Sequence, residues 1–245
     1  MTWDVDVATD VGKREINQDR FLALDMGGEA WFLAVADGVG GRNSGEVAAE
    51  LAVQELLKVA PRWKVDKMPE TVSDTIDGSL RKIHDTILAQ ARRQPALKGM
   101  ATTIACALVL PSGVLHRYAG DSILWWVRGD SILYRSRPHV VPSGSITSCL
   151  GGPSAPILSP RRQDEYDWFM KVKPGDVLLL ATDGLFRNLA PGKLLQLLTE
   201  PGSAKETTAR LIEAAIKAEV DDNVTVVVAK SDTNSVASGN SSTSS

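Results

Sequence analysis

The amino-acid sequence predicts an α+β fold in which a mixed or antiparallel sheet core is covered by helices on the outside. Two kinds of segment indicate this fold: short, nearly continuous apolar runs, typical of strands covered on both faces, and longer segments with helical periodicity. Their order is strands, two helices, a block of strands, two helices and a last strand. Because strict alternation of strand and helix is absent, this order argues against a doubly wound parallel sheet.

The strands are predicted from apolar runs. Four runs carry this prediction: residues 31–36, 103–110, 177–181 and 224–229. Shorter stretches at 21–24 and 115–120 are also assigned as strands. Cys106 lies inside the second run, so we expect its thiol to belong to the core and not to act as a nucleophile.

The first helix is predicted to begin at Asn43, because Asn43 and Glu46 have the spacing of a capping box. It would turn three apolar side chains toward the core: Val47, Leu51 and Leu57. We therefore expect this helix to pack one face against the sheet formed by the preceding strands.

The other helices follow from periodicity and position. Between residues 72 and 87, apolar residues recur every three or four positions and form one helical face. His84 lies in this helix and is expected at its surface. Two C-terminal helices are predicted at residues 191–198 and about 204–218.

Composition limits the classes of protein that the chain can be. Its 245 residues are 43% apolar and 23% charged, which allows a sizeable core. The formal net charge of −3 disfavours nucleic-acid binding. There is no signal-peptide pattern, and no apolar run approaches the ~20 residues that a membrane-spanning helix needs. We therefore expect a soluble, cytoplasmic, monomeric protein that binds neither nucleic acid nor membranes.

The chain is predicted to form one domain over residues 1–230, followed by a tail. Residues 231–245 contain many serines and almost nothing apolar, so this tail is expected to be disordered. Residues 136–160 are rich in proline, glycine and serine. They are predicted to form a surface loop that is long enough to have a function.

Aspartates recur where the predicted strands end. Asp37 and Asp183 each follow an apolar run and precede a glycine, and Asp19, Asp121 and Asp222 also lie at strand ends. A single aspartate of this kind commonly caps a turn or pairs with an arginine. Several in one domain repel one another unless cations lie between them. With only two cysteines and three histidines in the chain, a metal site would use oxygen ligands, which Mg²⁺ and Mn²⁺ prefer.

Six short motifs lie along the chain, and five of them contain one of these aspartates each. They lie at residues 14–19 (REINQD), 35–41 (VADGVGG), 101–103 (ATT), 119–122 (AGDS), 182–184 (TDG) and 221–225 (DDNVT). In these motifs and their order the chain resembles the metal-dependent protein phosphatases, the PPM or type-2C family of protein serine/threonine phosphatases, and in particular its bacterial members. The resemblance covers roughly residues 2–230.

The resemblance implies a four-layer α-β-β-α sandwich with two antiparallel sheets and a metal site at one edge. It implies a binuclear Mn²⁺ or Mg²⁺ centre in which Asp37 would bridge both ions. The carbonyl of Gly38 would bind one ion, and Asp183 and Asp222 would bind the other. Asp121 corresponds to the residue that, together with Asp183, holds a third, weaker ion in bacterial relatives.

The resemblance also implies roles for residues around the ions. Asp19 would orient metal-bound water without itself binding an ion, and Gln18 and Asn223 would support the site. Arg14 would bind the substrate phosphate, and its alternative is a surface ion pair with Glu15 or a nearby aspartate. Two close cations acidify a water molecule, so that hydroxide would attack phosphorus without a protein nucleophile.

Three departures from the family pattern matter for mechanism. Val39 stands where eukaryotic members carry a histidine thought to protonate the leaving group, so the general acid is left open. Gln18 replaces a glutamate of many members. The segment at about 136–160 is a shortened form of the flap that shapes substrate access in the family, which affects expected specificity more than activity.

The function expected from the resemblance is hydrolysis of phosphoserine and phosphothreonine in proteins. The expected partners are phosphorylated proteins, among them a serine/threonine kinase and its targets. Two alternatives stay open: a non-catalytic regulatory member that binds phosphoproteins, and a metal-dependent hydrolase of small phosphate esters.

Overall fold

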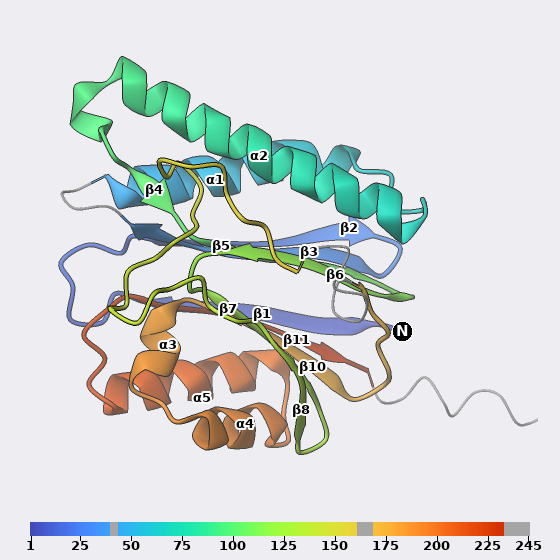
Figure 1. Cartoon of the computed structure of the whole chain (residues 1–245). Helices are drawn as coiled ribbons and strands as arrows, with labels where there is room; N and C mark the ends of the chain where they lie inside the picture. The colour runs from blue at the N-terminus through green and yellow to red at the C-terminus, as the bar shows by residue number, and fades with distance from the viewer. Residues whose placement is uncertain (40–43, 161–168, 233–245) are drawn as a thin grey trace, which may run out of the picture.

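The computed structural model describes residues 1–39, 44–160 and 169–232. Two antiparallel sheets lie face to face, and helices cover the outer face of each (Figure 1). The layers therefore follow the order helix, sheet, sheet, helix, and the predicted α-β-β-α sandwich is confirmed.

The first sheet has five strands in the order β1-β11-β10-β7-β8. They are β1 (Trp3–Asp10), β7 (Ile123–Arg128), β8 (Ser131–Arg135), β10 (Asp176–Ala181) and β11 (Val224–Ser231). The second sheet has the order β2-β3-β5-β6-β9, with β4 paired to β3. They are β2 (Asp19–Gly27), β3 (Ala30–Val39), β4 (Ala101–Thr102), β5 (Ile104–Leu110), β6 (Gly113–Ala119) and β9 (Phe169–Met170).

The helices divide between the two sheets. Helices α1 (Gly45–Val59) and α2 (Pro69–Arg93) cover the second sheet, and α4 (Pro191–Thr199) and α5 (Ala204–Lys217) cover the first (Figure 1). A short helix, α3 (Asp183–Arg187), follows β10 directly. The 3₁₀ turns η1 (Ala60–Arg62) and η2 (Pro95–Leu97) flank α2. The four apolar strands and the helices predicted from residue 72 onward are confirmed.

Alternation along the strands builds three apolar layers from the two sheets. On β3, Phe32 packs under α1 and α2, whereas its neighbour Leu33 faces the other sheet. On β10, Leu179 packs toward α4 and α5, whereas Leu178 faces the second sheet. Successive side chains of a strand point to opposite faces, so a continuous apolar run is the pattern that a strand between two covered faces requires.

The predicted start of α1 is wrong by one residue, and its predicted inward face is only partly right: Val47 and Leu51 pack half-buried against the core, but Leu57 does not. The helix begins at Gly45 with Ser44 as its N-cap, and the Ser44 side chain makes no capping bond. Asn43 itself lies outside the described residues. The buried face consists mainly of alanines with Leu56, whereas Leu57 is 47% exposed. Most of the deeply buried positions of α1 carry small residues because the helix approaches the sheet closely. A Cβ added to Gly45 would lie 2.5 Å from the Gly38 carbonyl oxygen.

The expectation that His84 lies at the surface is also wrong. Its side chain is buried, and its Nδ1 accepts a hydrogen bond of 3.0 Å from the backbone N–H of Gly151. Burial lowers the pKa of His84. His84 is buried because residues around Gly151, in the 136–160 segment, pack against α2 and cover the side of the helix on which His84 lies.

The segment at 136–160 contains no helix and no strand, as the loop prediction requires, yet it is held closely to the second sheet. Leu150 and Leu158 are buried in the core under α1 and α2. Isolated bridges join Leu150 to Thr102 and Ser159 to Tyr118. Apolar residues inside a polar loop thus anchor it, which its composition alone does not indicate.

The C-terminal boundary differs slightly from the prediction. Ser231, expected to be the first tail residue, pairs with Trp3 at the end of β11. Residues 233–245 lie outside the described range. Within the part of the chain that the structure describes, no helix has the length and apolar character needed to cross a bilayer.

Candidate metal centre

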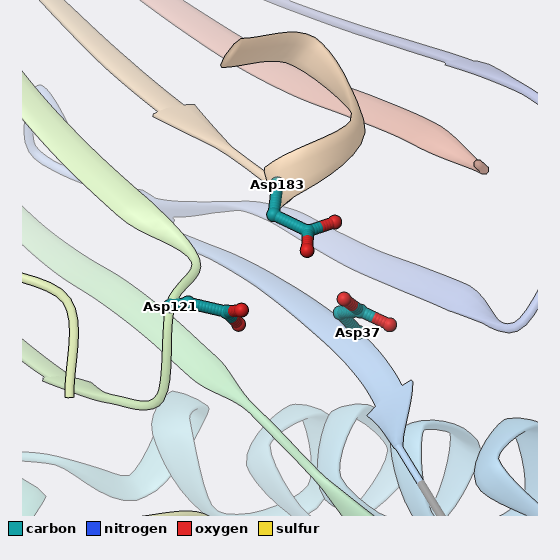
Figure 2. A group of neighbouring side chains, drawn as sticks. All are labelled: Asp37, Asp121 and Asp183. Carbon is teal, nitrogen blue, oxygen red and sulfur yellow. The ribbon is translucent and has the colours of Figure 1, made fainter. Parts of the chain in front are cut away.

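Three aspartates from different elements converge at one edge of the sandwich. Asp37 lies near the end of β3 in the second sheet, Asp121 follows β6, and Asp183 is the first residue of α3 after β10 of the first sheet. Each offers one carboxylate oxygen, and these atoms all lie within 4.8 Å of one another. Figure 2 shows the three carboxylates turned toward a common space.

Asp19 joins this group through the pairing of β2 with β3. It lies directly opposite Asp37 in the strand register. Thr182 donates a hydrogen bond of 2.7 Å from its Oγ1 to Asp19 Oδ2 and accepts one of 2.9 Å from the backbone N–H of Thr225. Asp19 is thereby held between the two sheets, next to the three-aspartate group.

Burial and mutual repulsion make the ionised cluster unfavourable when no metal ion is present. Burial, aided by the other carboxylates, raises the pKa of Asp37 well above its ordinary value. Burial and the charge of Asp121 raise the pKa of Asp183 to about 7, and burial raises the pKa of Asp19 to about 6. Burial and closely spaced like charges both raise a carboxyl pKa, and here they outweigh the pairing of Asp183 with Arg187.

The donor set fits a hard divalent cation. All side-chain ligands in the group are carboxylate oxygens, which suit Mg²⁺ and Mn²⁺. Asp121 Oδ1 is buried and has no hydrogen-bond partner among the described residues. Because a buried polar atom without a partner is costly, a ligand at this position would satisfy it.

The ATT motif fastens the backbone of Asp37. The backbone N–H of Asp37 donates to Thr103 Oγ1 at 3.0 Å, and the Asp37 carbonyl accepts from the Thr103 N–H at 2.8 Å. Thr102 Oγ1 donates to the same carbonyl at 2.9 Å. Thr103 Oγ1 also lies 2.7 Å from Ser122 Oγ, next to Asp121. Two motifs that are distant in the sequence therefore position two of the three aspartates.

Replacing Thr103 with valine is expected to lower the free energy of unfolding by about 1–3 kcal/mol, because the Asp37 N–H and the Ser122 hydroxyl lose a buried partner. Urea unfolding measures this change. Thr103→Ser is the matched control, since it keeps the hydroxyl. Equal stability of the valine and serine variants would contradict this account of the motif.

Asp222 lies beside the three-aspartate group and is held by arginines. Arg14 donates from Nη2 to Asp222 Oδ2 at 2.9 Å and from Nε to the carbonyl of Asp221 at 2.9 Å. Arg14 thus forms the ion pair named as its alternative, while its side chain stays 52% exposed. The structure places Asp222 next to the cluster, and the charge of Asp222 contributes to the raised pKa of Asp183.

Asn223 and Gln18 tie the N-terminal loop to this region. Asn223 Oδ1 accepts from the backbone N–H of Gln18 at 2.8 Å, and its Nδ2 donates to the carbonyls of Val11 and Ile16. The Gln18 side chain donates from Nε2 to Glu46 Oε2 at 3.0 Å. Residue 18 thus has an amide in place of a carboxylate, and that amide binds the carboxylate of Glu46.

Close backbone approach explains the glycine after Asp183. A Cβ on Gly184 would lie 2.0 Å from the carbonyl oxygen of Asn223, so only glycine lets α3 lie against the chain that carries Asp222. On the β3 side, a Cβ on Gly38 would lie 2.3 Å from the backbone of Gly45. Both Asp-Gly pairs therefore occur where two backbones meet at the cluster.

The sequence interpretation missed Arg187, Glu46 and Thr182 as members of this region. Arg187 forms ion pairs with Asp183 and with Asp222. Its spacing of four residues from Asp183 is the one sequence signal for such a pair, because these positions share a helix face. Glu46 was assigned to a helix cap, and Thr182 carried no signal beyond its motif.

Comparisons with known proteins agree with this geometry. A family model described as protein phosphatase 2C matches residues 10–225. Protein phosphatase PhpP of Streptococcus pneumoniae is 24% identical over 241 residues, covering 92% of this chain and 96% of that protein. Serine/threonine protein phosphatase PstP of Mycobacterium tuberculosis is 29% identical over 220 residues, covering 82% of this chain and 40% of PstP.

A solved structure of the S. agalactiae serine/threonine phosphatase superposes with a TM-score of 0.83 at 20% identity, covering 94% of this chain and all of that chain. At this identity the superposition supports the fold alone. The match of the family model over most of the chain shows more: the chain belongs to the protein phosphatase 2C family.

Proposed function

We propose that this protein hydrolyses phosphoserine and phosphothreonine in proteins at a centre of two Mn²⁺ or Mg²⁺ ions. The observation that carries the proposal is the convergence of Asp37, Asp121 and Asp183, whose oxygens lie within 4.8 Å of one another. Membership of the protein phosphatase 2C family makes the chain an enzyme that acts on phosphoproteins. The names of its bacterial relatives support serine and threonine as the phosphorylated residues.

The proposed ligands come from both sheets. Asp37 would hold both ions, the Gly38 carbonyl would hold one, and Asp183 and Asp222 the other. Asp121 with Asp183 would hold a third, weaker ion. Two such ions, when bound, acidify a water molecule and screen the charge of the phosphate.

The protein's own groups would bind and orient the reactants. Asp19, fixed by the Thr182 hydroxyl, would accept a hydrogen bond from the attacking water. Arg14 presents a half-exposed guanidinium at the rim of the cluster and would form charge-assisted hydrogen bonds with phosphate oxygens. Gln18 and Asn223 would support this arrangement by holding the loop that carries Arg14 against β11.

The domain and the partners follow from the same proposal. We infer that residues 1–230 act as one catalytic unit in the cytoplasm, with the 136–160 segment as a shortened flap. A serine/threonine kinase and its targets are the expected substrates, because phosphoproteins of this class are produced by such kinases.

Phosphate release from a phosphoserine or phosphothreonine peptide tests the function directly. We expect turnover with Mn²⁺ or Mg²⁺ and its loss in EDTA, with recovery when Mn²⁺ is restored. Activity that persists in EDTA would contradict the metal mechanism. Faster hydrolysis of nucleotides or sugar phosphates than of phosphopeptides would point instead to a small-molecule esterase.

A further inference from the structure

Arg187 makes two ion pairs at the cluster with a single guanidinium. Its Nη2 contacts Asp183 Oδ2, and its Nη1 lies 3.4 Å from Asp222 Oδ2. Among the residues that the structure describes, it is the basic side chain that forms an ion pair with Asp183. Arg187 therefore bridges the two carboxylates proposed to share one metal ion.

The two carboxylates differ in their access to water, and Arg187 reaches them from the solvent side. The side chain of Asp183 is 6% exposed and that of Asp222 is 21% exposed, whereas that of Arg187 is 48% exposed. Arg187 is the last residue of α3, whose first residue is Asp183. The short helix thus carries a buried anion at one end and a solvent-accessible cation at the other.

A cation bound to Asp183 and Asp222 would compete with Arg187 for the same carboxylates. Oxygens that coordinate a divalent ion lose much of their capacity to accept from a guanidinium, and the positive charge of the ion repels it. Binding of the ion and pairing of Arg187 are therefore linked, and each weakens the other by the same factor.

We propose that Arg187 is a built-in counter-cation of the Asp183–Asp222 pair, which divalent ions displace and which then binds the substrate phosphate. This inference rests on the proposed phosphatase function. The displaced guanidinium stays attached to α3 beside the site, and its planar fork matches two phosphate oxygens in a way that an ammonium group does not. Arg187 would thus act with Arg14, which contacts Asp222 from the loop between β1 and β2.

The test compares metal binding with substrate binding in the full-length chain stripped of metal. Calorimetric titration with Mn²⁺ is performed on the wild type, Arg187→Gln, Arg187→Lys and Arg92→Gln. The last variant removes the same charge from an exposed position at the end of α2 and controls for net charge. We expect Arg187→Gln to bind Mn²⁺ about five- to tenfold more tightly, because its internal competitor is gone.

The same variants are then assayed with a phosphopeptide at saturating Mn²⁺. We expect Arg187→Gln to raise KM about tenfold with a smaller change in kcat, since a charged contact to the phosphate is lost. Arg187→Lys keeps the charge without the fork, so it should bind Mn²⁺ like the wild type while still raising KM. Arg92→Gln should leave both quantities unchanged.

The outcomes separate this inference from the proposed function. A wild type that binds no Mn²⁺ would overturn the function itself. A wild type that binds Mn²⁺, together with an Arg187→Gln variant of unchanged Mn²⁺ affinity, would overturn the role as counter-cation. An unchanged KM in both Arg187 variants would overturn the phosphate contact.

Discussion

Replacing Asp183 with asparagine is expected to slow phosphopeptide hydrolysis by about 10³-fold or more while the fold is retained. Asp183, like Asp37, is proposed to serve two ion positions, and it belongs to the group whose oxygens lie within 4.8 Å of one another. An amide keeps the shape of the side chain but removes the negative charge that a divalent ion needs. Several kcal/mol of charge stabilisation would be lost with the ion.

The same substitution is expected to stabilise the metal-free protein at neutral pH. Burial raises the pKa of Asp183 to about 7 in the folded state, from an ordinary value of 3.8. Between these values the folded state holds a proton that the unfolded state has released, so the metal-free protein loses stability as the pH rises toward 7. Asparagine has no such titration, and it resembles the protonated acid.

Two measurements check this pair of expectations. Initial rates with a phosphopeptide and Mn²⁺ give the loss of activity, and thermal unfolding in EDTA at pH 7.5 gives the gain in stability. Asp130→Asn is the matched control, because Asp130 is exposed in the β7–β8 turn. Near-normal activity of Asp183→Asn would refute the ligand assignment, and a lower unfolding temperature would refute the account of the bare cluster.

The second large effect is expected at His116, which lies between the two sheets and takes no part in the proposed reaction. Its side chain is 1% exposed, and neither ring nitrogen has a hydrogen-bond partner among the described residues. The ring packs edge-on against Tyr134 with centroids 4.6 Å apart. Burial lowers the pKa of His116 to about 3, because a charged imidazole in this apolar layer would lack water.

The sign of the pH effect follows from this depressed pKa. Above pH 6.5 both folded and unfolded states hold neutral His116, and the full stability is present. As the pH falls below 6.5, His116 becomes protonated in the unfolded state but stays neutral in the folded state down to about pH 3. The free energy of unfolding therefore decreases. Between pH 7.5 and 4.5 this group alone should remove about 3 kcal/mol from the free energy of unfolding.

Urea unfolding of wild type and His116→Leu at pH 7.5 and pH 4.5, in EDTA, isolates this contribution. The aspartate cluster titrates in both proteins and cancels in the comparison, as does any packing cost of leucine that is the same at both pH values. We expect the variant to lose about 3 kcal/mol less than the wild type over this interval. Parallel pH dependence in the two proteins would show that His116 is not buried in the neutral form.

Helix α2 could be predicted because its pattern is local, whereas the face of α1 was predicted only in part, correctly for Val47 and Leu51 and wrongly for Leu57. The apolar face between residues 72 and 87 needs only the helical period. In α1, ranking residues by hydrophobicity favours Leu57, but the sheet accepts the alanine face, since Gly38 and Gly45 bring the two backbones together. The prediction that His84 is exposed was wrong for a related reason, because a loop distant in the sequence covers its side chain.

The aspartates of the candidate site were predicted from strand ends and motifs, and their surroundings were not. Nothing in the spacing of Asp37 and Thr103 indicates that a hydroxyl fastens the aspartate backbone. The double ion pair of Arg187 depends on bringing Asp222 to the end of α3, which Gly184 permits.

The sequence by itself determined the order of the elements, the family and the carboxylates available for a metal site, because periodicity and motifs are properties of short segments. Only the tertiary structure decided that Asp37, Asp121 and Asp183 converge, that Thr103 and Ser122 link two of them, and that arginines neutralise Asp222. These contacts join segments from both sheets, and their geometry depends on strand register and on the packing of one sheet against the other.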